Sequence, residues 1–84
     1  MKETRIGTVT HYYSHLHVAG VMITDGELHT GDRIHITGRT SDFEQTVRSM
    51  EMDHEHVDIA RPGDDIGLAV IDHARENDLV YRVS

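Results

Sequence analysis

Apolar and polar residues alternate with a period of two in parts of this chain, which is typical of β-strands and not of helices. Ile34 and Ile36, for example, are separated and flanked by polar residues. Other runs are almost continuously apolar, as expected for strands that are buried on both faces. Six segments are predicted as strands: Ile6–Tyr13, Val18–Thr24, Arg33–Thr37, Phe43–Met52, Asp65–Ile71 and Leu79–Val83.

The fourth segment, Phe43–Met52, has two interpretations. Its apolar residues change parity between Val47 and Met50, so a strand needs a bulge near Arg48–Ser49 to keep them on one face. A helix would instead place Phe43, Val47 and Met50 at i, i+4 and i+7. We favour a strand, because the segment contains β-branched residues and its neighbours are all predicted strands.

The stretch from Asp25 to Gly38 organises the rest of the chain, because it joins two strands through closely spaced turn residues. It begins with an Asp-Gly turn pair, continues through the single apolar anchor Leu28, and bends again at Gly31 before the strand that follows Asp32. The chain must reverse within very few residues here. Gly31 is therefore predicted to have a positive φ.

Short strands separated by turn signals predict an all-β fold, a small closed or nearly closed six-stranded antiparallel β-barrel. Gly7 and Gly20 lie inside predicted strands and indicate a bulge or a close backbone approach. With 84 residues the chain has room for one core, so residues 1–84 are expected to form a single domain. The predicted core includes Ile34, Ile36, Val47, Ile66, Leu68 and Val80.

The net charge limits the classes of binding partner, and the absence of cysteine limits the possible chemistry. The chain has 15 acidic and 8 basic residues, a net charge of −7 with His neutral, which disfavours nonspecific binding to polyanions. It has no cysteine, which excludes disulfides, thiolate nucleophiles and thiolate zinc sites. No apolar segment is long enough for a signal peptide or a membrane span, so a cytoplasmic location without a membrane partner is expected.

The pattern G-x-L-x-x-G-D-x-I-x-I, from Gly26 to Ile36, resembles the central stretch of the second domain of translational GTPases such as elongation factor Tu. The segments Ala60–Gly67 and Asn77–Tyr81 extend this similarity, which covers nearly the whole chain. Asn77 stands where the family commonly has glycine, and Asn also accepts left-handed backbone conformations. The resemblance implies a β-barrel of the translation-factor domain 2 type.

The phosphate-binding loop G-x-x-x-x-G-K-S/T is absent, so GTP hydrolysis is not expected. The chain is similar to the free-standing translation elongation factor-like proteins, which are this barrel without its GTPase. A similar barrel is appended to some collagenase-like peptidases, so the resemblance also implies a role in protein docking. Neither resemblance carries over a catalytic residue, and neither enzyme activity nor a cofactor is predicted.

Two polar clusters are candidates for chemistry. In extended chain, His54 and His56 would point their rings the same way beside Asp53, a geometry that can hold a divalent ion. Such clusters are common by chance in a chain with 8 His and 15 acidic residues, so no metal site is predicted. The pair Asp64–Asp65 follows Pro-Gly, where Asp side chains commonly accept hydrogen bonds from turn amides, and is predicted to be structural.

Aromatic rings and guanidinium groups can recognise bases, phosphates or a protein surface without a strongly basic face. Tyr12 and Tyr13 must face opposite sides of one strand, so at most one of them is expected in the core. The candidate residues for binding nucleic acid or a partner are His11, Tyr12, Tyr13, Arg39, Phe43 and Arg48.

The leading functional hypothesis is a noncatalytic binding module that docks on the ribosome, on RNA or on a translation-associated protein. The alternative is a protein–protein docking subunit for a separate enzyme, such as a collagenase-like peptidase. Both hypotheses include a protein partner.

Overall fold

The computed structural model describes residues 2–84, which form ten strands and no helix. Accordingly, none of these residues belongs to a helix that is long and apolar enough to cross a membrane. The prediction of an all-β fold is confirmed. The strands are β1 (Glu3–Tyr13), β2 (Val18–Ile23), β3 (Leu28–His29), β4 (Arg33–Thr37), β5 (Asp42–Thr46), β6 (Met50–Met52), β7 (Glu55–Val57), β8 (Ile59–Ala60), β9 (Asp65–Ala69) and β10 (Leu79–Val83).

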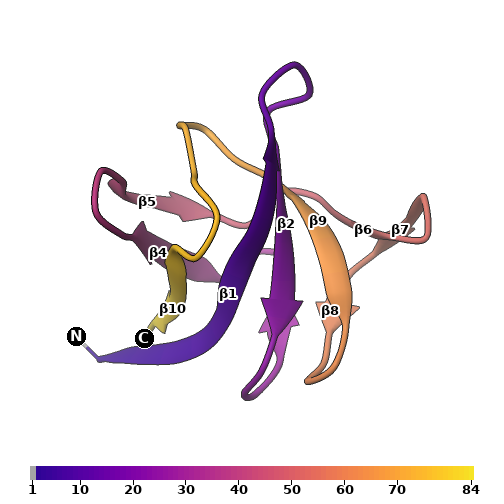
Figure 1. Ribbon diagram of the computed structural model, residues 1–84. Helices are drawn as coiled ribbons and strands as arrows, with labels where there is room; N and C mark the ends of the chain where they lie inside the picture. The colour runs from indigo at the N-terminus through magenta and orange to yellow at the C-terminus, as the bar shows by residue number, and fades with distance from the viewer. Residues whose placement is uncertain (1) are drawn as a thin grey trace.

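Eight of the strands form one sheet in the order β5-β4-β10-β1-β2-β9-β6-β7, and β3 pairs with β8 separately. The pairings are antiparallel. Figure 1 shows the long strands β1 and β2 at the centre, with β4, β5 and β10 on one side and β6 to β9 on the other. The sheet curls so that its two halves enclose the core.

Side-chain hydrogen bonds join β5 to the chain at the end of β9. Gln45 of β5 donates through Nε2 to the carbonyl oxygen of Ala69 at 2.9 Å and accepts from the N–H of Ile71 at 2.8 Å. These two strands lie far apart in the sheet order, so the contact brings the curled sheet back on itself. The structure is a nearly closed barrel of the translation-factor domain 2 type, as predicted.

The core follows from the alternation within the strands. Inward positions of β4 and β9 are fully or almost fully buried and the residues between them are more exposed, while β10 contributes the buried Val80. Tyr12 and Phe43 are partly buried against this cluster. All predicted core residues are buried: Ile34, Ile36, Val47, Ile66, Leu68 and Val80.

Two bulges bend β1, and glycines lie beside both of them. The register of β1 shifts between Arg5 and Gly7, and again between Val9 and the residue opposite Gly20. A Cβ atom on Gly7 would lie 2.5 Å from the carbonyl oxygen of Met22. The predicted close backbone approach is therefore confirmed at Gly7, and the bulges give the curvature that a small barrel requires.

One turn geometry occurs three times, at the entrances to β4, β9 and β10. Its third residue has a positive φ, as in a type II turn, and its fourth residue is an Asp whose carboxylate accepts the N–H of the first. The positive φ predicted for Gly31 is confirmed, and Asn77 adopts the left-handed conformation expected of it. The three pairs are Gly31 (φ 97°) with Asp32, Gly63 (φ 94°) with Asp64, and Asn77 (φ 74°) with Asp78.

The helical alternative for Phe43–Met52 is wrong, and the strand is interrupted. It forms β5 and β6, separated by residues 47–49 instead of being joined through a bulge. Val47 turns its buried side chain inward while its N–H donates to the carbonyl oxygen of Asp32 at 2.8 Å. This break, and the short strands β3, β7 and β8, explain why the structure has more strands than the six predicted.

Candidate functional site

The candidate site is a groove on the outer face of β1, β2, β9 and β6. The inward residues of β2 and β9 fill the core, so Val18, Gly20 and Gly67 point outward by the period of two. Gly20 and Gly67 lie directly opposite each other in the antiparallel register. The floor of the groove is low at Gly67, which has no side chain, whereas Gly20 is buried and Thr10 Oγ1 lies 3.0 Å from where its Cβ atom would be.

One end of the groove is apolar. Tyr13 ends β1, and Leu16 lies in the tight connection to β2, the hairpin loop that stands above the rest of the barrel in Figure 1. These side chains are 47% and 70% exposed, unusually high values for large apolar groups. Val18 continues the apolar wall along β2. An exposed aromatic and an exposed aliphatic side chain beside a hollow are typical of interaction surfaces.

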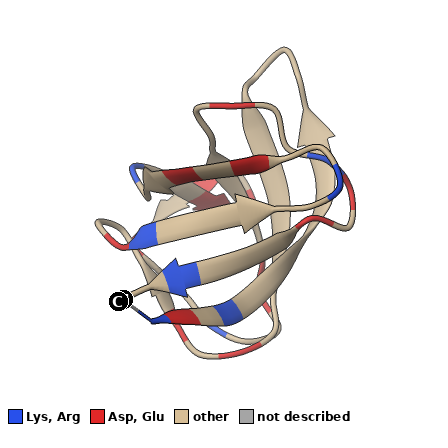
Figure 2. Ribbon diagram, turned by 90° about the vertical axis from the view of Figure 1, so that its left-hand side faces the viewer, with Lys and Arg blue, Asp and Glu red and all other residues tan. Residues whose placement is uncertain are grey.

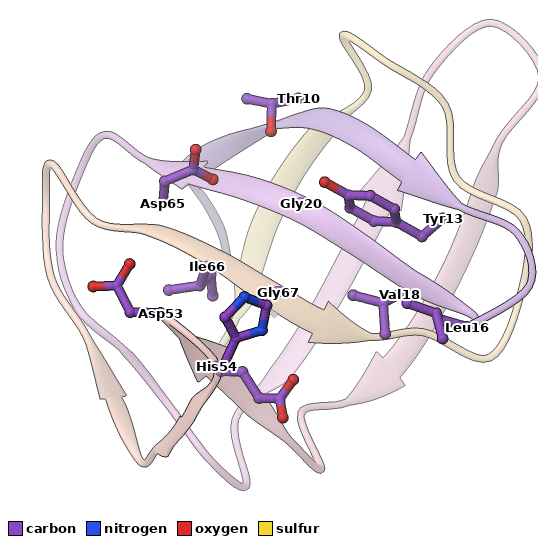
Figure 3. Close-up of a pocket in the computed structure, with 11 residues that line it drawn as sticks. Thr10, Tyr13, Leu16, Val18, Gly20, Asp53, His54, Asp65, Ile66 and Gly67 are labelled. Atoms are coloured by element: carbon purple, nitrogen blue, oxygen red, sulfur yellow. The ribbon is translucent and has the colours of Figure 1, made fainter.

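The other end of the groove is acidic. Asp53 in the β6–β7 turn and Asp65 at the start of β9 line it, and Glu51 of β6 adds a carboxylate beside Gly67 nearer the centre of the groove. Within residues 2–84, the ion pairs all involve other carboxylates. Figure 3 shows Asp53 and Asp65 at one end of the groove, with Tyr13 and Leu16 at the other. The hollow has a volume of about 410 Å³.

The β6–β7 turn also corrects the premise of the metal hypothesis. Asp53 and His54 have φ values of 54° and 65°, both positive, as in a two-residue type I′ hairpin turn. His54 is thus in a turn and not in extended chain, and His56 bonds to Asp58 at 3.0 Å. Within the described residues, no three metal-binding side chains converge.

The half of the sheet formed by β4, β5, β10 and the start of β1 carries a different charge pattern. Figure 2 shows basic positions on neighbouring strands there, alongside an acidic β5. These arginines have partners: Arg33 lies 3.7 Å from Glu44, and Arg82 donates to the carbonyl oxygen of Glu27. Arg33 is thus paired with a carboxylate and Arg82 with a backbone carbonyl, whereas within residues 2–84 the groove carboxylates form no ion pair.

His35 is the centre of a second polar cluster, on the same half of the sheet. Its Nε2 lies 2.5 Å from Asp42 and its Nδ1 lies 2.9 Å from Glu3, while the ring is only 19% exposed. Both ring nitrogens face carboxylates, so both act as donors when the imidazole is protonated. The hydrogen bonds to Asp42 and Glu3 raise the pKa of His35 above 6.5. The cluster connects β1, β4 and β5 and is structural in character.

The structure places the predicted binding residues in different environments. Tyr13 lines the groove, whereas Tyr12 on the opposite face stacks against His73 with ring centroids 4.4 Å apart. His11 lies 3.4 Å from Glu76 and packs edge-on against Tyr13. Only Tyr12 of the two tyrosines packs against the core, as expected.

The other three candidates do not join this group. Arg39 borders a separate hollow with Arg75, on the far side of the loop that contacts His11. Phe43 is half-buried against the core, and Arg48 is exposed in the break between β5 and β6. The six residues therefore do not form one continuous surface.

Most residues of the groove were not singled out from the sequence. Glycine at two outward positions of predicted strands was the available signal, because a side chain is normally present there to cover the sheet. The opposition of Gly20 and Gly67 depends on the pairing of β2 with β9, which sequence periodicity does not specify. The groove residues missed in this way are Leu16, Val18, Glu51 and Gly67, while Asp53 and Asp65 were considered only as a metal-ligand candidate and as part of a turn.

The fold defines a small β-barrel domain of the translation-factor domain 2 type. A family model for elongation factor Tu domain 2 matches residues 17–77, and the chain belongs to this family.

The curated relatives of the chain are proteases. It is 35% identical over 81 residues to an uncharacterized protease of Methanocaldococcus jannaschii, and 37% identical over 82 residues to a collagenase of Porphyromonas gingivalis. These matches cover 95% and 96% of the chain but only 20% and 23% of the two relatives. The chain thus spans about a fifth of the length of the curated relatives it matches.

Two solved structures have the same fold. Both are crystal structures of the C-terminal domain of a putative U32 peptidase from Geobacillus thermoleovorans, one of them a selenomethionine variant. The TM-scores are 0.86 for the variant and 0.87 for the other structure, at 19% and 18% identity. The alignments cover 92% and 94% of this chain and 96% and 91% of those chains.

Proposed function

We propose that this chain is a noncatalytic docking module that works with a peptidase of the U32 or collagenase-like type. The observation that carries the proposal is the pattern of coverage. Nearly the whole chain matches about a fifth of each protease, at 35% and 37% identity. A segment of that size corresponds to one barrel beside a much larger remainder, which is the arrangement expected of an accessory domain. The proposal treats residues 1–84 as one domain.

The groove supplies a surface that suits such a role. Protein interfaces combine an apolar centre with a polar rim, and Tyr13 and Leu16 beside Glu51 and Asp65 provide both. Aromatic anchors contribute disproportionately to protein–protein binding.

The net negative charge and the groove carboxylates weigh against the hypothesis of a role in translation. A net charge of −7 and carboxylates without ion-pair partners repel phosphate groups, so RNA contact is disfavoured at the groove. The protease relatives favour the docking alternative over a role on the ribosome. The family match to elongation factor Tu domain 2 supports the barrel fold. The binding partner is identified by the experiment described next.

The test is affinity purification with the tagged chain from an extract of its source cells, with the captured proteins identified by mass spectrometry. A U32 or collagenase-like peptidase is expected as the dominant partner, and its direct binding is then measured with purified components. Ribosomal proteins as the dominant, salt-resistant capture would overturn the proposal. So would the absence of binding between the purified chain and the purified peptidase.

A further inference from the structure

We propose that the groove on β1, β2, β9 and β6 binds an extended, basic peptide segment that carries one apolar side chain. This inference deepens the docking role proposed above by naming the chemistry of the segment that the groove takes. It rests on three features of the groove: its low floor at Gly67, its two chemically distinct ends and the distance between those ends.

The floor admits a peptide backbone. Gly20 and Gly67 face each other at the centre of the groove, where the close-up in Figure 3 shows them between the two ends. A Cβ atom on Gly67 would touch a methyl group of Val18 at 3.3 Å, whereas the Cβ position of Gly20 is covered by Thr10 Oγ1 at 3.0 Å. The absence of a side chain at Gly67 leaves room for an extended chain that runs along β9, and its side chains can reach both ends.

The two ends select opposite chemistry. Tyr13, Leu16 and Val18 offer an apolar contact for one side chain. At the other end, Asp53 and Asp65 offer carboxylates that form no ion pair with a Lys or Arg of the described chain. A Lys or Arg of the partner would supply the missing positive charge, and the surplus of acidic residues in the whole chain steers such a segment toward the site.

The register sets the spacing between the two side chains. Val18 lies opposite Ala69, and Asp65 is four residues further along β9, a separation of about 13 Å at the rise of a strand. Residues i and i+4 of an extended peptide have the same separation and point to the same side. The preferred segment therefore has its apolar residue and its basic residue four positions apart.

The probe is a synthetic nine-residue peptide, Thr-Ser-Leu-Thr-Ser-Thr-Lys-Ser-Thr, titrated into the isotopically labelled protein and followed by amide NMR. Saturable shifts are expected at the amides of Gly20, Gly67 and Asp65. Raising the salt concentration should weaken the binding, because exposed charges are screened. Peptides with Glu in place of Lys, or Ser in place of Leu, should bind several-fold more weakly.

Pairs of variants, one inside the groove and one outside it, test whether the peptide binds in the groove. Leu16→Ser should weaken the affinity about fivefold or more, whereas Ile71→Ser should leave it unchanged, since Ile71 is an equally exposed apolar residue outside the groove at 68% exposure. Asp65→Asn should weaken it about two- to fivefold, with Glu44→Gln on β5 as the charge control. Circular dichroism melting confirms that each variant is folded.

The outcomes separate this inference from the proposed function. Absence of saturable shifts with the Lys peptide, equal binding of the Glu peptide, or equal effects of groove and control variants would each overturn the groove assignment. If the purified peptidase binds the Leu16→Ser and Asp65→Asn variants as well as the parent, docking stands and the groove inference fails. If the Lys peptide binds as described but the peptidase does not, the groove inference stands and the proposed function fails.

Discussion

The side chain of Gln45 forms a hydrogen bond with the backbone N–H of Ile71, with Oε1 accepting at 2.8 Å. The same amide donates through Nε2 to the carbonyl oxygen of Ala69, and the side chain is only 4% exposed. One buried amide thus satisfies two backbone groups where β5 meets the end of β9 and no strand pairing is present. At this position the barrel is held together by side-chain hydrogen bonds instead of the backbone hydrogen bonds of paired strands.

Replacing Gln45 with Leu should therefore destabilise the protein by about 2–4 kcal/mol, because two buried backbone groups lose their partners. Urea unfolding followed by circular dichroism measures the change. Thr46→Ser, at the exposed neighbouring position, is the control and should cost less than about 0.5 kcal/mol. A Leu variant as stable as the parent would show that water replaces the amide at this seam.

Substitutions of Gly31 test the effect of backbone strain in the absence of a steric clash. Its φ is 97°, and a Cβ atom there would meet no atom within 4 Å. Gly31→Val should cost about 1–3 kcal/mol in unfolding free energy, purely because a β-branched residue disfavours positive φ. Gly31→Asn should cost less, since Asn tolerates this region better. Equal losses for the two variants would contradict the assignment to backbone conformation.

A substitution of Gly7 tests the opposite situation, in which the paired strand leaves no space for a Cβ atom. A Cβ atom would lie 2.5 Å from the backbone oxygen of Met22, and backbone in the paired strand cannot move away as a flexible side chain can. Gly7→Ala should lower the unfolding free energy by about 2–4 kcal/mol through separation of β1 from β2. Gly67→Ala is the matched control, since its nearest contact is a methyl group at 3.3 Å, and thermal melts of both variants should rank them clearly. A larger loss at Gly67 would refute this account of the bulge.

The cluster around His35 predicts a specific pH dependence. Hydrogen bonds to Asp42 and Glu3 raise the pKa of His35 in the folded state above the unfolded value of 6.5. The folded state binds the proton more tightly, so the stabilisation is complete below pH 6.5 and is lost as the pH rises through the raised folded pKa.

The measurement is the difference in unfolding free energy between the parent and His35→Gln across this range, because subtraction removes the contribution of the other histidines. The difference should be largest at acidic pH and shrink above neutrality. A difference that is flat with pH would show that His35 acts only by packing.

Local patterns in the sequence determined the strands and the core. Arg33–Thr37 and Leu79–Val83 have the predicted boundaries, because each begins just after an Asp that closes a turn, and Arg33–Thr37 also alternates strictly. Positive φ at Gly31 was predictable for the same reason: the demand comes from a few adjacent residues. Periodicity and turn chemistry act over short stretches of chain, and a single sequence contains that information directly.

Tertiary structure alone decided where distant segments meet. The strand over Phe43–Met52 broke because Val47 is held by the backbone of Asp32, and His54 entered a left-handed turn because β6 pairs back with β7. The groove exists because the register of β2 with β9 sets Gly20 opposite Gly67 and leaves Leu16 and Asp65 at its two ends. These relationships depend on pairings between residues far apart in the chain, which the period of two permits but does not choose.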